Sequence, residues 1–149
     1  MSIISFVRQG FEFLPVQVDA TSLPGLPKIQ LMGLPDTPLR ESLTRVQSAL
    51  MAQGFDLPTN KKILVNVRPN HMKKTSRGLD LALAAAILQA TNQWRPKPDD
   101  SPYLYGEVLL DGQVLAPEDL IELLELPAGS EIMTGSGVEH PFYGLRVIK

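Results

Sequence analysis

The sequence predicts an α+β fold: a two-layer domain in which helices pack on one face of a mixed β-sheet. Segments with strand-like alternation and segments with helical periodicity follow each other in a mixed order, which favours this class. The chain has 149 residues, 44% of them hydrophobic, and this length suits one domain with a substantial core. We therefore expect a single domain over residues 1–149.

The N-terminal part of the chain is expected to form three strands. Phe13–Ala20 alternates in part between apolar and polar side chains, and Ile3–Arg8 is its expected hairpin partner. Ser22–Pro27 is rich in turn residues, so a connector is predicted there. The third strand is expected at Lys28–Met32.

The first helix is predicted from Asp36 to Gln53. Asp36 or Thr37 can cap its N-terminus, and Pro38 falls in the first turn, where the missing N–H costs nothing. Gly54 suits the left-handed conformation that often ends a helix. Four apolar residues share one helical face, which we expect to pack against the sheet: Leu39, Leu43, Val46 and Leu50.

The middle of the chain combines a strand, a basic loop and a second helix. A strand is predicted at Ile63–Val67 and a polar loop at Arg68–Gly78. Leu79–Ala90 is apolar almost all round, which predicts a buried helix on the same face of the sheet as the first. Trp94 is expected to pack at the end of this helix.

The C-terminal part is expected to begin with a linker at Asn92–Asp100. A strand is predicted at Leu104–Leu110, with a turn at Asp111–Gly112 that leads into a returning strand at Gln113–Leu115. The remaining predicted elements are a helix at Pro117–Leu126 and short strands at Glu131–Thr134 and Leu145–Ile148.

The composition argues against several kinds of site. The chain contains no cysteine, which excludes disulfides and thiolate metal sites. Its two histidines, His71 and His140, lack the spacing of a metal pair. There is no signal-peptide pattern, and no apolar stretch approaches the roughly 20 residues that span a bilayer. We expect a soluble, cytoplasmic protein that uses no cofactor.

Charge is distributed unevenly along the chain. Six basic and no acidic residues occur in residues 61–77, whereas residues 98–145 contain no Lys or Arg. Lys73, Lys74 and Arg77 share one predicted loop and are the candidate contacts to nucleic acid or a partner, because clustered cations displace condensed counterions. The alternative is an ordinary solvated loop, and no aromatic residue is interleaved for base stacking.

Five blocks of sequence, in order, resemble the N-terminal domain of the ComM/YifB branch of Mg-chelatase-like AAA+ proteins. They are residues 23–36 (similar to GLPGFTIVGLPE), Glu41–Leu50 (E-x-x-x-R-V-R-S-A-L), Lys62–Pro69 (RITVNLAP), Gly78–Ala84 (GRFDLPIA) and Gly106–Gly112 (GELxLDG). Together they cover roughly residues 20–115. The C-terminal third of the chain matches the family pattern poorly.

The resemblance implies a fold similar to the proteolytic domain of Lon. Lon-type hydrolysis needs a serine nucleophile that opens the buried helix and a lysine base on the later helix. These positions fall here within Leu79–Leu81 and Asp119–Ile121, so neither member of the dyad is present. Ser76 is close in sequence, but it belongs to the preceding loop. The resemblance thus implies the fold of a peptidase without its catalytic residues.

The function implied by the resemblance is that of a non-catalytic accessory domain beside the AAA+ module of the same or a related protein. The chain lacks G-x-x-x-x-G-K-[ST], so it should not hydrolyse ATP alone. Complete relatives resemble ATPases that act on DNA, with competence and helicase roles. We expect oligomers only through the AAA+ ring, and no membrane partner. The alternatives are a divergent Lon-like serine peptidase and a weak nucleic-acid-binding module.

Overall fold

The computed structural model describes residues 3–10, 12–33, 36–69, 77–98, 103–119 and 132–134, with only the backbone described for Arg77 and Met133. The elements are, in chain order, β1 (Ile3–Gln9), β2 (Glu12–Pro24), β3 (Lys28–Leu31), α1 (Thr37–Ala52), β4 (Lys61–Arg68), the 3-10 turn η1 (Arg77–Leu79), α2 (Asp80–Ala90), β5 (Tyr103–Leu104), β6 (Glu107–Val108), β7 (Val114–Leu115) and β8 (Ile132–Met133).

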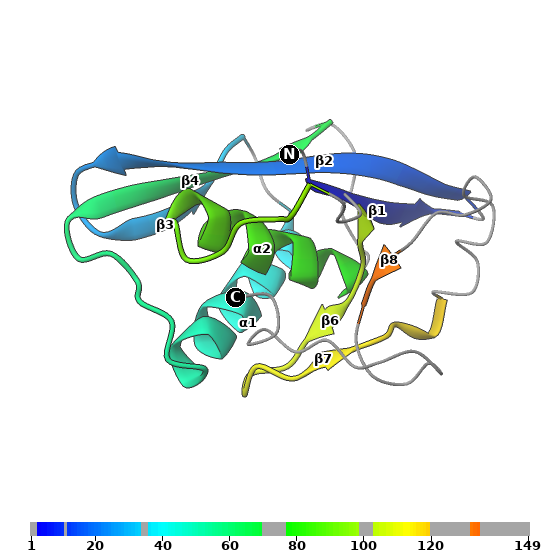
Figure 1. Ribbon diagram of the computed structural model, residues 1–149. Coiled ribbons are helices and arrows are strands. Elements are labelled where there is room, and N and C mark those ends of the chain that lie inside the picture. Colours follow the sequence, from blue (N-terminus) through cyan, green and yellow to red (C-terminus); the bar gives the residue numbers. More distant parts are fainter. Residues whose placement is uncertain are drawn as a thin grey trace.

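These strands form a six-stranded mixed sheet in the order β3-β4-β2-β1-β5-β8, with β6 and β7 as a separate hairpin (Figure 1). The pairs β1–β2 and β2–β4 are antiparallel, while β3–β4, β1–β5 and β5–β8 are parallel. The predicted α+β class, with a mixed sheet and two helices, is confirmed.

Strand β2 is longer than the sequence predicted. The connector expected at Ser22–Pro27 is wrong in its first half, because Ser22–Pro24 continue the strand. The reason is that β4 starts at Lys61, earlier than the predicted Ile63, and supplies a pairing partner as far as Pro24 opposite Lys61. Pairing across the sheet therefore overrides the turn preference of these residues.

Helix α1 forms where its local signals place it. The Asp36 carboxylate caps the helix by accepting a hydrogen bond from the Leu39 N–H at 2.9 Å, and Pro38 lies in the first turn. Gly54, just past the helix, has φ of +80°, the left-handed conformation that glycine adopts without strain. The predicted start and end of this helix are confirmed.

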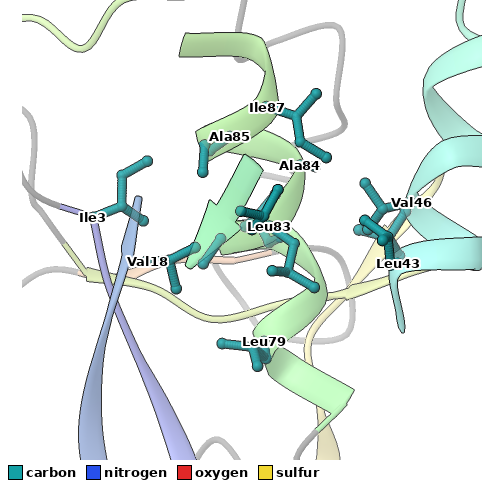
Figure 2. Packing of buried hydrophobic residues seen from close by; sticks show 14 of the residues in the cluster. Ile3, Val18, Leu43, Val46, Leu79, Leu83, Ala84, Ala85 and Ile87 are labelled. Atoms are coloured by element: carbon teal, nitrogen blue, oxygen red, sulfur yellow. The ribbon is translucent and has the colours of Figure 1, made fainter. Parts of the chain in front are cut away.

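Helix α2 is the helix that packs directly on the sheet, and α1 packs mainly on α2 (Figure 1). Nine consecutive residues of α2, from Asp80 to Leu88, are buried. The apolar face of α1 is also buried as predicted, but Leu43 and Val46 point towards α2 rather than the sheet (Figure 2). This corrects the expected contact: a helix that is apolar on all sides needs cover on the side away from the sheet.

The strand predicted at Leu104–Leu110 is divided into two. β5 belongs to the main sheet and β6 to the separate hairpin, whose predicted turn at Asp111–Gly112 is confirmed. Between them the backbone turns towards the start of α2: the Gly106 N–H donates to the Gly78 carbonyl at 2.8 Å, and the Gly106 carbonyl accepts from the Leu81 N–H at 3.0 Å. These contacts replace sheet pairing at the break.

The sheet carries a second, smaller apolar cluster on the face opposite the main core. Successive strand residues point to opposite faces; Val7 belongs to the main core, whereas its neighbour Phe6 packs with Tyr103 and Tyr105. The Phe6 and Tyr103 rings stack with their centroids 5.8 Å apart. Both faces of this part of the sheet are therefore apolar.

The remaining predictions have mixed outcomes. Trp94 is buried and joins the main core, as predicted, and β8 confirms the strand expected at Glu131–Thr134. The helix predicted at Pro117–Leu126 lies mostly outside the described residues, and the strand at Leu145–Ile148 lies wholly outside them. Among the described helices, none has both the length and the apolar character needed to cross a membrane.

Candidate functional site

A charged residue opens the most apolar helix of the chain. Asp80 is the first residue of α2, and its side chain is wholly buried. A carboxylate is stable in such surroundings only when other groups compensate for its lost hydration. The groups that contact Asp80 therefore indicate its role in the fold.

Arg45 of α1 supplies the main compensation. Its Nε donates to Asp80 Oδ2 at 3.1 Å and its Nη2 donates to Asp80 Oδ1 at 3.0 Å, a two-pronged pairing of guanidinium and carboxylate. The same Nη2 donates to Ser42 Oγ at 3.0 Å, and the backbone N–H of Val108 donates to Asp80 Oδ2 at 3.1 Å. We call Ser42, Arg45, Asp80 and Val108 the Arg45–Asp80 node.

The electrostatics of the node contain opposing effects. Burial raises the pKa of Asp80 above its ordinary value of 3.8, while the hydrogen bonds from Arg45, Ser42 and the Val108 N–H, and the charge of Arg45, act to lower it. Burial is the largest of these effects. The contacts with Arg45, Ser42 and Val108 therefore offset only part of the hydration that the Asp80 carboxylate loses on burial.

The backbone beside the node is packed too closely for a side chain at one position. A Cβ on Gly78 would stand 2.2 Å from the ring of Tyr105, so this position requires glycine. Tyr105 is itself fixed by its hydroxyl, which donates to Asp119 Oδ1 at 2.9 Å. The start of α2 is therefore enclosed by the break between β5 and β6.

The arrangement joins three elements, and its groups are already engaged with one another. Each prong of the Arg45 guanidinium and each oxygen of Asp80 has a partner within the fold. Neither side chain of the pair is a nucleophile of the kind used in acyl transfer. The chemistry that this node supports best is attachment of α1 and the β6–β7 hairpin to α2.

The structure describes only some of the basic residues in the segment 61–77. Lys73 and Lys74 lie outside the described residues, as does Ser76, and the side chain of Arg77 is also undescribed. Lys62 and Arg68 lie at opposite ends of β4 and, by strand alternation, on the same face. Whether Lys73, Lys74 and Arg77 contact nucleic acid stays a prediction.

Sequence reasoning considered Asp80 only within the nucleophile position Leu79–Leu81 and missed its buried ion pair, although a signal was present. Asp80 is the only charged residue within Leu79–Ala90. A single acidic residue in an otherwise apolar helix requires a buried cationic or hydrogen-bonding partner. Which residue supplies that partner, 35 positions away, is decided by packing.

Comparison with known families matches residues 16–129 to the family described as subunit ChlI of Mg-chelatase. The chain belongs to this family. The YifB protein of Escherichia coli K12 is 36% identical over 103 residues, which cover 69% of this chain and 20% of that protein. Competence protein ComM of Haemophilus influenzae Rd is 31% identical over 112 residues, which cover 75% of this chain and 22% of ComM.

A mycobacterial relative shows the same extent of similarity. Rv2897c of Mycobacterium tuberculosis H37Rv is 37% identical over 103 residues, which cover 69% of this chain and 20% of the relative. The chain therefore spans about a fifth of the length of these curated relatives. The resemblance to the ComM/YifB branch of the Mg-chelatase-like family is confirmed.

Three of the family-like blocks contribute residues to the Arg45–Asp80 node. Arg45 comes from the block Glu41–Leu50, Asp80 from Gly78–Ala84, and Val108 from Gly106–Gly112. Blocks that are far apart in the chain thus meet at the Arg45–Asp80 node. In this member of the family, the node pairs Arg45 of the block Glu41–Leu50 with Asp80, the charged residue of the block Gly78–Ala84.

Proposed function

We propose that this chain is a non-catalytic accessory domain of a ComM/YifB-like AAA+ protein. The observation that carries the proposal is the state of Asp80, which occupies the region where a Lon-type peptidase would hold its serine. Asp80 is wholly buried and paired with Arg45 at 3.0 Å. An aspartate buried in such an ion pair stabilises the fold and presents no nucleophile to a substrate.

The proposal includes a Lon-like fold without peptidase activity. In support, the buried helix α2 follows β4 and η1 and packs on a mixed sheet, and Gly106, just before β6, bonds to the start of this helix. The candidate base position at Asp119 carries a carboxylate that accepts from Tyr105 and lies 3.9 Å from Arg8. A carboxylate in these contacts does not replace a lysine base.

The absence of peptidase activity is tested with the purified chain. We expect no cleavage of unfolded casein and no covalent labelling by a fluorophosphonate, which reacts with activated serines. The matched control is Ser76→Ala, because Ser76 is the serine closest in sequence to the start of α2. Stoichiometric labelling of the native chain that disappears in Ser76→Ala would establish the peptidase alternative.

The proposed partner is the AAA+ module of the same or a related protein, in the cytoplasm. Support comes from the family and from the length of the relatives, of which the aligned 103 residues of this chain cover only 20%. The name competence protein, carried by the Haemophilus relative, supports a competence-related role of the whole protein, which we propose to be DNA processing. Sequencing the gene beyond the codon for Lys149 tests the partnership: we expect a G-x-x-x-x-G-K-[ST] motif, and its absence would argue against an AAA+ module in cis.

A further inference from the structure

Five large apolar residues are exposed in the described part of the chain, and four of them gather in two places. Leu23 and Leu26 are 44% and 86% exposed near the turn between β2 and β3, and Met51 and Leu110 are 66% and 59% exposed near the end of α1. Exposed apolar residues that cluster indicate contact surfaces more strongly than isolated ones. Each cluster also has a distinct charge.

The first cluster lies at one end of the main sheet and is surrounded by lysines. Cross-strand pairing places Lys62 beside both Leu23 and Lys28, and Lys61 opposite Pro24. No acidic residue occurs in residues 20–35 or 57–69. Strand alternation places Lys61 on the opposite face of β4 from Lys62, so Lys61 is not counted here. We call Leu23, Leu26, Lys28 and Lys62 the lysine–leucine surface; it is apolar at its turn and positive beside it.

The second cluster lies where the β6–β7 hairpin meets the C-terminal end of α1. Ser48 Oγ donates to the Leu110 carbonyl at 3.2 Å, and Gln53 Nε2 donates to the Asp111 carbonyl at 2.7 Å. These bonds fix the turn of the hairpin on α1, and Met51 follows Ser48 by three residues, on the same side of the helix. We call Met51, Leu110 and Asp111 the hairpin–helix surface.

The two surfaces are complementary in charge. Asp111 is exposed, and the hairpin belongs to residues 98–145, which contain no Lys or Arg. In Figure 1 the β2–β3 turn lies at the left end of the sheet, whereas the β6–β7 turn and the end of α1 lie at the bottom of the molecule. The surfaces are separate within one molecule, so they are positioned to meet only between molecules.

We propose that copies of this domain associate head to tail, with the lysine–leucine surface of one copy against the hairpin–helix surface of the next. Such a contact joins two different surfaces and leaves one of each free, so it extends into rings or chains. A nucleic acid or an anionic membrane would use the lysines alone and leave Met51 and Leu110 uncovered. A second copy covers both clusters. This inference departs from the expectation that oligomers form only through the AAA+ ring, and it is independent of the proposed accessory function.

Sedimentation velocity of the purified chain tests the contact, at concentrations up to about 1 mM, where a contact with millimolar Kd is substantially formed. We expect association that strengthens with concentration and weakens at high salt, because exposed charges are screened. Leu26→Ser should weaken association by about tenfold to a hundredfold, the equivalent of losing burial of one leucine side chain. Arg40→Glu alters an exposed charge in the first turn of α1, at the opposite end of that helix from Met51, and is the matched control; it should associate like the native chain.

Complementation between variants decides whether the contact is head to tail. Lys28→Ser with Lys62→Ser disables one surface, and Leu110→Ser with Asp111→Asn disables the other; the asparagine oxygen can still accept from the Gln113 N–H in the hairpin turn. Each double variant alone should remain monomeric, while an equimolar mixture should form a 1:1 dimer and stop there. All altered side chains lie on the surface, and circular dichroism confirms folding. A mixture that stays monomeric, or a native chain that is monomeric at the highest concentration in low salt, overturns the proposal.

Discussion

Two aspartate–arginine pairs in this molecule have nearly the same shortest distance in different surroundings. Arg45 and Asp80 approach to 3.0 Å with side chains that are 19% and 0% exposed, whereas Arg68 and Asp19 approach to 2.9 Å with both side chains 49% exposed. The first pair joins α1 to α2, and the second lies across β4 and β2. Distance alone therefore does not distinguish a pair that organises the fold from a pair at its surface.

The difference lies in what happens when one partner is lost. Water can solvate an exposed arginine or aspartate, so surface pairs contribute little to stability. A buried charge has no such substitute, and the Val108 N–H would also lose its acceptor. The contribution of an ion pair to stability therefore depends on how well water solvates each partner when the other is removed.

The largest effect is expected for Asp80→Ala. This change leaves the Arg45 guanidinium without its carboxylate and the Val108 N–H without an acceptor, so the free energy of unfolding should fall by about 3–5 kcal/mol. Urea denaturation followed by circular dichroism measures the loss. A loss below about 1 kcal/mol, the range of surface pairs, would show that the node does not hold the helices together.

Leu43→Ala separates the contribution of packing from that of charge on the same helix. Leu43 is buried on the face of α1 that points to α2 (Figure 2), two residues before Arg45. A large-to-small change in a core should cost about 2–5 kcal/mol, measured by the same denaturation. If this variant retained native stability, α1 would be attached by the ion pair alone.

The pH dependence of stability tests the buried pair separately, through the titration of Asp80. Because burial raises the pKa of Asp80 above 3.8, the folded chain holds this proton to a higher pH than the unfolded chain. Above pH 3.8 the folded state then binds more protons, so the contribution of Asp80 to the free energy of unfolding falls as pH rises through the raised pKa. Relative to Asp80→Asn, which cannot titrate, the native chain should lose stability over this interval. A relative gain with rising pH would contradict the assigned direction.

The smallest effect is expected for Asp19→Ala. Arg68 is half exposed and can be hydrated when its partner is removed, so the free energy of unfolding should change by about 0.2–1 kcal/mol. Denaturation in low and high salt provides the measurement, and the small difference should shrink as salt screens the charges. A loss comparable to that of Asp80→Ala would remove the distinction between the two pairs.

The sequence predicted elements whose signals are local. Helix α1 has its cap at Asp36, its proline in the first turn and its glycine after the last turn, all within the segment itself. Helix α2 was also predicted, because an apolar run of that length has few alternatives. The extension of β2 to Pro24 was missed, since it depends on pairing with Lys61, which is 37 residues away.

Contacts between distant segments were beyond sequence reasoning. The pairing of Asp80 with Arg45, which lies 35 positions earlier on another helix, is set by packing and not by any local pattern. Likewise, the division of the strand after Leu104 follows from backbone bonds between Gly106 and the start of α2, which no periodicity encodes. A lone acidic residue in an apolar helix is the kind of signal that should prompt a search for a distant cation.

The parallel pairing of β1 with β5 has a consequence for the order in which the molecule forms during synthesis. Ile4 pairs with Tyr103, so one edge of β1 stays unpaired until a segment about a hundred residues later in the sequence has been synthesised. During that interval β1 can pair with β2, but Phe6 lacks the rings of Tyr103 and Tyr105 that later cover it. Contacts between such distant residues slow folding and prolong the exposure of apolar surface. The emerging N-terminal hairpin is therefore the stage at which a chaperone would be most useful to this protein.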